Sequence, residues 1–98
     1  MKAITKAELF AQLGSLKSTQ TLANNQVVIN FCYGEVMQSY GKTIGVYTDN
    51  GKWYFDPHYH DYSATTSKYC TKWCGLSTPS RRRAVEKDPK HYQYLELN

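Results

Sequence analysis

An alternation of apolar and polar side chains begins at Val27, and it constrains the fold of this chain more than any other feature. The alternating segment is Val27-Val28-Ile29-Asn30-Phe31-Cys32-Tyr33. Successive side chains of a β-strand point to opposite faces, so the odd-numbered residues would share one face and the even-numbered ones the other. The pattern therefore predicts a strand that runs from Val27 through Gly34 towards Met37.

Two more strands are predicted to follow. A turn near residues 39–41 would lead into a strand over Lys42 to Thr48, with Ile44 and Val46 on one side. Asp49-Asn50-Gly51 is the clearest hairpin signal, because Asn-Gly accepts the positive φ angles of a two-residue type I′ turn. Lys52 to Phe55 would be the return strand. The segment from about residue 27 to residue 55 is thus predicted to form a three-stranded antiparallel meander.

The N-terminal segment from Thr5 to Leu16 is predicted to be a helix. Thr5-Lys6-Ala7-Glu8 has the spacing of a capping box, in which each end side chain accepts the backbone N–H of the other residue. Leucines then recur every three or four residues as one apolar stripe. The polar stretch from Ser18 to Gln26 is predicted to be a loop.

Two short helices and a last strand are predicted for the C-terminal half. Thr65 or Thr66 would cap a helix that ends at Cys74 before a left-handed Gly75. On this helix an apolar stripe is formed by Tyr69, Cys70, Trp73 and Cys74. Residues 78–80 would open a third helix, closed by Asp88-Pro89. The tail from His91 to Leu97 alternates and is predicted to add a strand to the edge of the meander.

The chain as a whole is predicted to be a single α+β domain over residues 1–98. Its 98 residues fit one domain, and its hydrophobic and charged fractions of 41% and 20% are those of a globular protein. No apolar signal core and no stretch apolar enough to span a membrane is present, so a cytoplasmic protein is expected. Three cysteines do not suggest a disulfide framework. The oligomeric state stays open.

Positive charge is concentrated in the C-terminal half. Residues 68–90 contain seven basic and two acidic residues, a net charge of +5, whereas the whole chain carries +4. Such local charge steers an anionic partner. Three consecutive helical residues fan over about 200°, so Arg81, Arg82 and Arg83 cannot all face one partner. At least one is expected to be solvated or paired with Glu86 or Asp88. The candidate partner-binding residues here are Lys68, Lys72, Arg81, Arg82, Arg83 and Lys87, with a solvated helix face as the alternative.

Two further groups are candidates for binding. The hydroxyl residues Thr65, Thr66 and Ser67 precede Lys68 at a predicted helix start, where exposed N–H groups attract anions. Plain helix capping is the alternative. Tyr59 and Tyr62 lie in a predicted loop, where they are candidates for stacking on unpaired bases.

Catalysis and metal binding have little support in the sequence. No nucleophile elbow, P-loop or glycine-rich dinucleotide turn is present. His58, His60 and Asp61 resemble a metal-nuclease cluster only in composition. Cys70 and Cys74 fall on the apolar stripe, where a free cysteine acts as a small hydrophobe. We expect no metal, no cofactor and no enzymatic activity.

Two segments resemble a paired signature of small, uncharacterised bacteriophage accessory proteins. They are Ser39-Tyr40-Gly41-Lys42-Thr43-Ile44-Gly45 and Tyr62-Ser63-Ala64-Thr65-Thr66-Ser67-Lys68. In similar proteins a strand hairpin leads into this helix start, and the lysine is often followed by histidine, where this chain has Tyr69. The resemblance spans roughly Val27 to Cys74.

The resemblance implies a phage context and a bacterial host. Small basic phage proteins bind host nucleic-acid machinery or block host defences. The sequence is therefore expected to encode a non-enzymatic accessory protein that binds a host protein or ribonucleoprotein through its basic C-terminal surface, an anti-CRISPR-like inhibitor being one form. Direct DNA or RNA binding and a small metal-dependent enzyme are the two alternatives.

Overall fold

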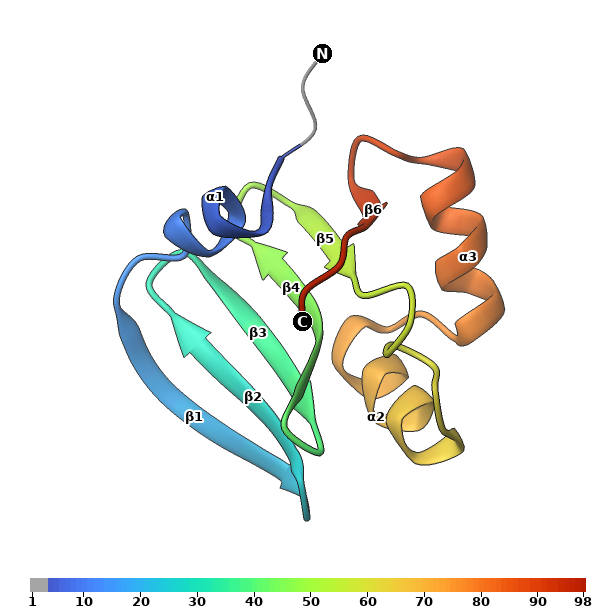
Figure 1. The fold of residues 1–98 in the computed structure, drawn as a ribbon, viewed down its shortest axis with the longest axis horizontal. Coiled ribbons are helices and arrows are strands. Elements are labelled where there is room, and N and C mark those ends of the chain that lie inside the picture. Colours follow the sequence, from blue (N-terminus) through green and yellow to red (C-terminus); the bar gives the residue numbers. More distant parts are fainter. Residues whose placement is uncertain (1–3) are drawn as a thin grey trace.

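A six-stranded mixed sheet with three helices forms the fold, which confirms the predicted α+β class. The computed structural model describes residues 4–98. The strands lie in chain order across the sheet, and only the last pair, β5 and β6, is parallel (Figure 1). The elements are α1 (Lys6–Ala11), β1 (Leu16–Ala23), β2 (Gln26–Phe31), β3 (Gly34–Ser39), β4 (Lys42–Thr48), β5 (Lys52–Phe55), α2 (Ala64–Cys74), α3 (Thr78–Lys87) and β6 (Tyr92–Tyr94).

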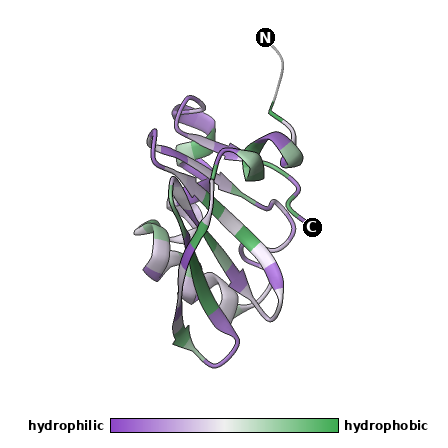
Figure 2. Ribbon diagram, turned by 90° about the vertical axis from the view of Figure 1, so that its left-hand side faces the viewer, coloured by the Kyte–Doolittle hydropathy of each residue, from purple (hydrophilic) through white to green (hydrophobic). Residues whose placement is uncertain are grey.

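Both faces of the sheet carry a hydrophobic cluster. The consecutive residues Val36 and Met37 point to opposite faces, and each belongs to a different cluster. On one face, α1 and the C-terminal tail contribute Leu9, Leu13 and Leu97. The other face is covered by α2 and α3, and its cluster is completed by Val28, Ile44, Phe55 and Cys70. Figure 2, which views the molecule from the β1 side, shows hydrophobic stretches along the strands between hydrophilic loops.

The predicted three-stranded meander is not what residues 27–55 form, because the first strand is divided. β2 ends at Phe31, a turn at Cys32 and Tyr33 follows, and β3 runs back along it. The turn is held by the link between α1 and β1, since Tyr33 N–H donates to the carbonyl of Leu13 at 2.9 Å. Gly34 is required after this turn, because a Cβ there would lie 2.2 Å from the carbonyl oxygen of Tyr47.

β1 lies in the segment that was predicted to be a loop. It pairs antiparallel with β2, and its first six residues are exposed. The hydrophobic pattern misses this strand because an edge strand with little burial keeps a polar sequence.

α1 is shorter than predicted, although its capping box is present as expected. Thr5 Oγ1 accepts the N–H of Glu8, and a Glu8 carboxylate oxygen accepts the N–H of Thr5, both at 3.1 Å. The helix ends at Ala11, and Gly14 turns the chain with φ of 74°. As a result Leu16 belongs to β1 and is 62% exposed, outside the apolar stripe.

A β-bulge in β4 corrects the prediction that Ile44 and Val46 share a side. Met37 pairs with Gly45 and Gln38 with Thr43, so Ile44 is the extra residue of the bulged strand. The bulge turns Ile44 towards α2, whereas Val46 stays with α1.

The type I′ turn lies at a different hairpin from the predicted one. Tyr40 and Gly41, with φ of 51° and 79°, form the two-residue loop between β3 and β4. Asp49-Asn50-Gly51 is a three-residue loop, since Thr48 pairs with Lys52 and φ is positive at Gly51 but not at Asn50.

The start of α2 brings together the two segments, residues 39–45 and 62–68, that resemble phage proteins. Ser39 Oγ and Thr66 Oγ1 lie 2.8 Å apart in a buried hydrogen bond. Further along α2, the ring of Trp73 packs so closely on β4 that a Cβ at Gly45 would lie 2.5 Å from it. Gly75 ends the helix with φ of 81°, as predicted, but the N-cap is Ser63 in place of Thr65 or Thr66.

The C-terminal tail is tied to the sheet by Asp56, whose side chain is 1% exposed. Its Oδ1 accepts the N–H groups of His58 and Tyr59, and its Oδ2 accepts the N–H of Leu97 and the side-chain amide of Asn98. Burial acts to raise the pKa of Asp56, but these hydrogen bonds outweigh it and hold the pKa below its ordinary value.

Within residues 4–98, no helix has the length and apolar character that a membrane crossing requires.

Candidate binding surface on α2 and α3

Arg81 is the centre of the region that the sequence marked as a binding surface, and it is completely buried. Nε donates to His60 Nδ1 at 3.0 Å, and Nη1 donates to Thr71 Oγ1 and to the carbonyl oxygen of Leu76 at 3.0 and 2.8 Å. Nη2 donates to three oxygens, those of Thr78 Oγ1 (2.9 Å), Ser67 Oγ (3.3 Å) and the His60 carbonyl (3.4 Å). We call Arg81 and these acceptors the Arg81 network. Burial takes Arg81 out of the predicted partner-binding set.

The Arg81 network fixes the protonation state of His60. A nitrogen that accepts a hydrogen bond carries no proton, so His60 is neutral with its hydrogen on Nε2. Burial lowers the pKa of His60, and the positive charges of Arg81 and Arg82 lower it further against the opposing effect of Asp61. The network therefore ties the loop after β5 to α2 and α3 with neutral acceptors only.

Two thiols on α2 adjoin the Arg81 network. The hydrogen bond from Cys70 lowers the pKa of Cys74 to about 6, and the charge of Arg81 acts in the same direction against burial. The same hydrogen bond, together with burial, raises the pKa of Cys70. The two groups titrate as a pair. Cys74 is half-buried and Cys70 fully buried, and the Cys74 thiol donates to the carbonyl oxygen of Leu76 at 3.5 Å.

With Arg81 held inside, α3 presents its other basic residues outward. Arg83 and Lys87 are exposed and lie four residues apart, so they share one side of the helix. Arg82 is also exposed and pairs with Asp61 at 2.8 Å, and the exposed Arg83 meets the expectation that at least one arginine is solvated. Neither Arg83 nor Lys87 has an ion-pair partner among residues 4–98. We call Arg82, Arg83 and Lys87 the α3 basic face.

The lysines of α2 are grouped around Tyr69. Lys68 Nζ and Lys72 Nζ lie over the ring of Tyr69, at 5.5 and 5.2 Å from its centroid. Ser67 and Thr71, which accept from Arg81, are each two residues from Tyr69, or about 200° around the helix. Lys68 and Lys72 therefore lie on a different side of α2 from the two residues that hold Arg81.

The hydroxyl residues at the start of α2 are used mainly inside the protein. Thr66 is buried against Ser39, and Ser67 hydrogen-bonds both Thr78 and Arg81. Only Thr65 is exposed. Their arrangement is that of internal packing and capping, with Ser63 accepting the N–H of Thr66.

Tyr59 and Tyr62, the candidates for base stacking, lie against each other. Their ring centroids are 5.6 Å apart in an edge-to-face arrangement, and Lys42 Nζ lies 5.4 Å from the centroid of Tyr59. Tyr59 is half-buried in the α2 cluster, whereas Tyr62 is 47% exposed. Tyr62 thus remains available for a stacking contact.

The residues of the suggested metal cluster do not converge. His58 is exposed and lies 3.4 Å from Glu96, whereas His60 is buried and accepts from Arg81. Within residues 4–98 no group of three or more His, Cys, Asp or Glu is arranged to hold a metal ion.

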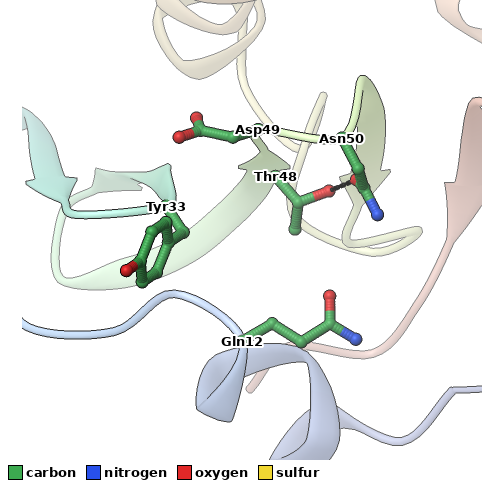
Figure 3. Close-up of a pocket in the computed structure, with 5 residues that line it drawn as sticks. All are labelled: Gln12, Tyr33, Thr48, Asp49 and Asn50. Carbon is green, nitrogen blue, oxygen red and sulfur yellow. Dashed lines mark hydrogen bonds between the residues drawn. The ribbon is translucent and has the colours of Figure 1, made fainter.

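Two open clefts lie near the β4–β5 hairpin. The smaller, about 250 Å³, is lined by five polar or aromatic side chains, Gln12, Tyr33, Thr48, Asp49 and Asn50 (Figure 3). The larger, about 560 Å³, lies between this hairpin and the turn after α3, and Lys52, Lys90 and His91 line it. Sequence reasoning missed this group because Lys52 is distant along the chain from the other two. Parallel pairing of β5 with β6 brings them together.

The fold and this surface define a small α+β protein with a six-stranded mixed sheet and a basic helical face. Residues 11–89 match a family described as a family of unknown function, DUF8033, and the chain belongs to it. The match runs from the end of α1 to the turn after α3 and includes the whole Arg81 network. No curated protein and no solved structure matches the chain.

Proposed function

We propose that this protein is a non-enzymatic binding protein whose α3 basic face contacts an anionic surface of a macromolecular partner, with phage-host nucleic-acid or defence machinery as the partner class. The observation that carries the proposal is the contrast within one run of three arginines. Arg81 is satisfied by six internal hydrogen bonds, while Arg83 is exposed without an acidic partner among residues 4–98.

The contrast matters because side chains on a helix of fixed position bind a partner with a smaller loss of conformational entropy than side chains on a mobile segment. The hydrogen bonds of Arg81 reach α2 and the loop after β5, so they fix the position of α3. Arg83 and Lys87 then project from a held helix, so binding has to order their side chains but not the helix itself. Guanidinium and ammonium groups in this setting recognise carboxylates or phosphates.

The test compares two charge reversals on the same chain. Arg83→Glu changes the α3 basic face, and Lys6→Glu makes a reversal of the same size on α1, where Lys6 is also exposed. Each tagged variant is used to capture partners from a bacterial host lysate. The proposal predicts that Arg83→Glu loses the captured partner and that Lys6→Glu retains it. Equal retention by both variants would show that the face does not carry binding.

Direct nucleic-acid binding is the second candidate, favoured by the exposed Tyr62, whose ring packs on Tyr59, and by Lys42, which lies over the ring of Tyr59. Fluorescence anisotropy with single-stranded and duplex oligonucleotides at low salt tests it. If the candidate holds, affinity falls steeply with salt, and Tyr62→Ala weakens the single-stranded complex more than the duplex. No binding at low salt leaves a protein partner as the target of the α3 basic face.

A further inference from the structure

The first strand of the sheet offers a second surface, unconnected with the basic helices. β1 is eight residues long, and in the described sheet it pairs with β2 alone. At its outer edge, every second residue presents its N–H and C=O groups away from the sheet. In Figure 1 β1 forms the left margin of the sheet, and α2 and α3 lie on the opposite side of the molecule.

β1 lacks most of the features that keep sheet edges from pairing. Natural edge strands are short, covered, or interrupted by proline and inward-facing charge. β1 contains no proline, and Lys17 is its single charged residue. By contrast, the opposite edge strand, β6, has three residues. Bulges occur only towards the ends of β1, so Ser18, Thr19, Gln20 and Thr21 keep a regular ladder with β2.

The sequence of β1 is complementary to itself. Two identical strands that pair antiparallel about a twofold axis perpendicular to the sheet place one residue opposite its own copy. With Thr19 at the axis, Thr19 faces Thr19 and Ser18 faces Gln20, so polar side chains meet polar side chains. Lys17 faces Thr21 and does not meet its own copy. With Gln20 at the axis, Ser18 would face the apolar Leu22, which is a poorer match.

The placement of charge also favours a second copy of this chain as the occupant. α3 contacts β6, at the other edge of the sheet from β1. Two copies joined through β1 would therefore keep their α3 basic faces apart, although each chain carries a net charge of +4. We propose that β1 pairs with β1 of a second copy, about an axis through Thr19, to form a dimer with one continuous twelve-stranded sheet.

The experiment is a measurement of mass in solution by analytical ultracentrifugation over a range of protein concentrations. The native chain is expected to form a dimer of twice 11.3 kDa. Thr19→Lys places two like charges directly opposite each other at the axis, so that variant is expected to be a monomer. Thr65→Lys is the matched control, because Thr65 is an exposed threonine on α2, and it should remain a dimer.

Circular dichroism and thermal unfolding check that Thr19→Lys still folds, which is expected because Thr19 is exposed. The register is tested separately by oxidising Thr19→Cys and Gln20→Cys variants in a Cys32→Ser/Cys74→Ser background, which removes the exposed and the half-buried native thiols. A crosslinked dimer is expected with Thr19→Cys only. A native chain that stays monomeric, a dimer that survives Thr19→Lys, or crosslinking through Gln20→Cys alone would each overturn the proposal.

The consequence for partner binding rests on the proposed function. A dimer through β1 would carry two α3 basic faces, and two linked sites bind a repeating anionic partner more tightly than one. The mass measurement uses no partner, so its outcome is independent of whether the α3 basic face binds anything.

Discussion

Arg81 donates its Nε hydrogen to Nδ1 of His60 at 3.0 Å in a site where the two residues are 0% and 2% exposed. A buried guanidinium without a carboxylate partner is unusual, because burial of a charge is costly unless every donor is satisfied. Here the five N–H groups have neutral acceptors from three parts of the chain. The pair therefore acts as the main polar link between the helices and the loop after β5.

The first prediction concerns the geometry of this link. Arg81→Lys keeps the positive charge but replaces a five-donor fork with a single ammonium group, which cannot reach all the acceptors. Leaving buried acceptors unpaired should lower the free energy of unfolding by roughly 3–4 kcal/mol. Urea denaturation followed by tryptophan fluorescence measures this. Arg83→Lys, on the exposed side of α3, should change stability by less than about 0.5 kcal/mol. Similar losses for both variants would contradict the assigned role.

The Arg81 network shows what sequence patterns can and cannot predict. Charge clustering and helical spacing place Arg81, Arg82 and Arg83 on one helix and require that they diverge. They do not say which arginine turns inward, because that depends on acceptors supplied by distant segments. His60 and Thr71 become neighbours of Arg81 only when the loop after β5 and α2 pack against α3.

In the sheet, too, the features set by neighbouring residues were predicted, and those set by pairing between distant strands were not. Lys42–Thr48 and Lys52–Phe55 were predicted with their observed bounds because their alternation and the intervening glycine are local signals. The bulge at Ile44 and the strand β1 were missed. The bulge is set by pairing with β3, and β1 is polar because it lies at an edge.

The second prediction concerns the pH dependence that His60 gives to stability. Burial lowers the pKa of His60 in the folded state, whereas in the unfolded chain it takes a proton near the ordinary value of about 6.5. The unfolded state therefore binds more protons as the pH falls below 6.5. The stabilising contribution is complete above that pH and is lost as pH falls towards the folded-state pKa.

Unfolding free energies measured between neutral pH and pH 5 should show this loss in the native chain. His60→Gln should reduce the slope of stability against pH. A slope that is unchanged by His60→Gln would mean that His60 takes its proton in the folded state without cost.

The third prediction concerns the attachment of the C-terminus. Asp56→Asn removes the charge that strengthens four hydrogen bonds and turns an amide hydrogen towards at least one N–H donor. We expect a loss of roughly 2–4 kcal/mol in unfolding free energy, measured by urea denaturation. Asp49→Asn, at an exposed loop residue, should have little effect.

Titration of Asp56 should make the protein less stable in acid. The pKa of Asp56 is lowered in the folded state, so its contribution is present above its ordinary pKa of 3.8 and is lost as pH falls through the folded-state value. The native chain should lose stability across this acid range, and Asp56→Asn should lose less. Parallel curves for the two proteins would exclude Asp56 as the responsible group.

The last prediction concerns the reactivity of Cys74. The hydrogen bond from Cys70 lowers the pKa of Cys74 to about 6, so the alkylation rate of Cys74 should rise with pH through a midpoint near that value. Iodoacetamide labelling, resolved by residue with mass spectrometry, measures the rate at each thiol. Cys32, which is exposed, serves as the reference within the same chain, and Cys70, which is buried, should react slowest.

Cys70→Ala isolates the cause of this reactivity, because it removes the donated hydrogen bond and leaves the charge of Arg81 in place. The midpoint of Cys74 should then shift to higher pH, towards the ordinary thiol value of about 8.5 that labelling of the urea-unfolded chain should give. If the rate at Cys74 follows that of Cys32 throughout the pH series, the paired thiols do not stabilise an anion.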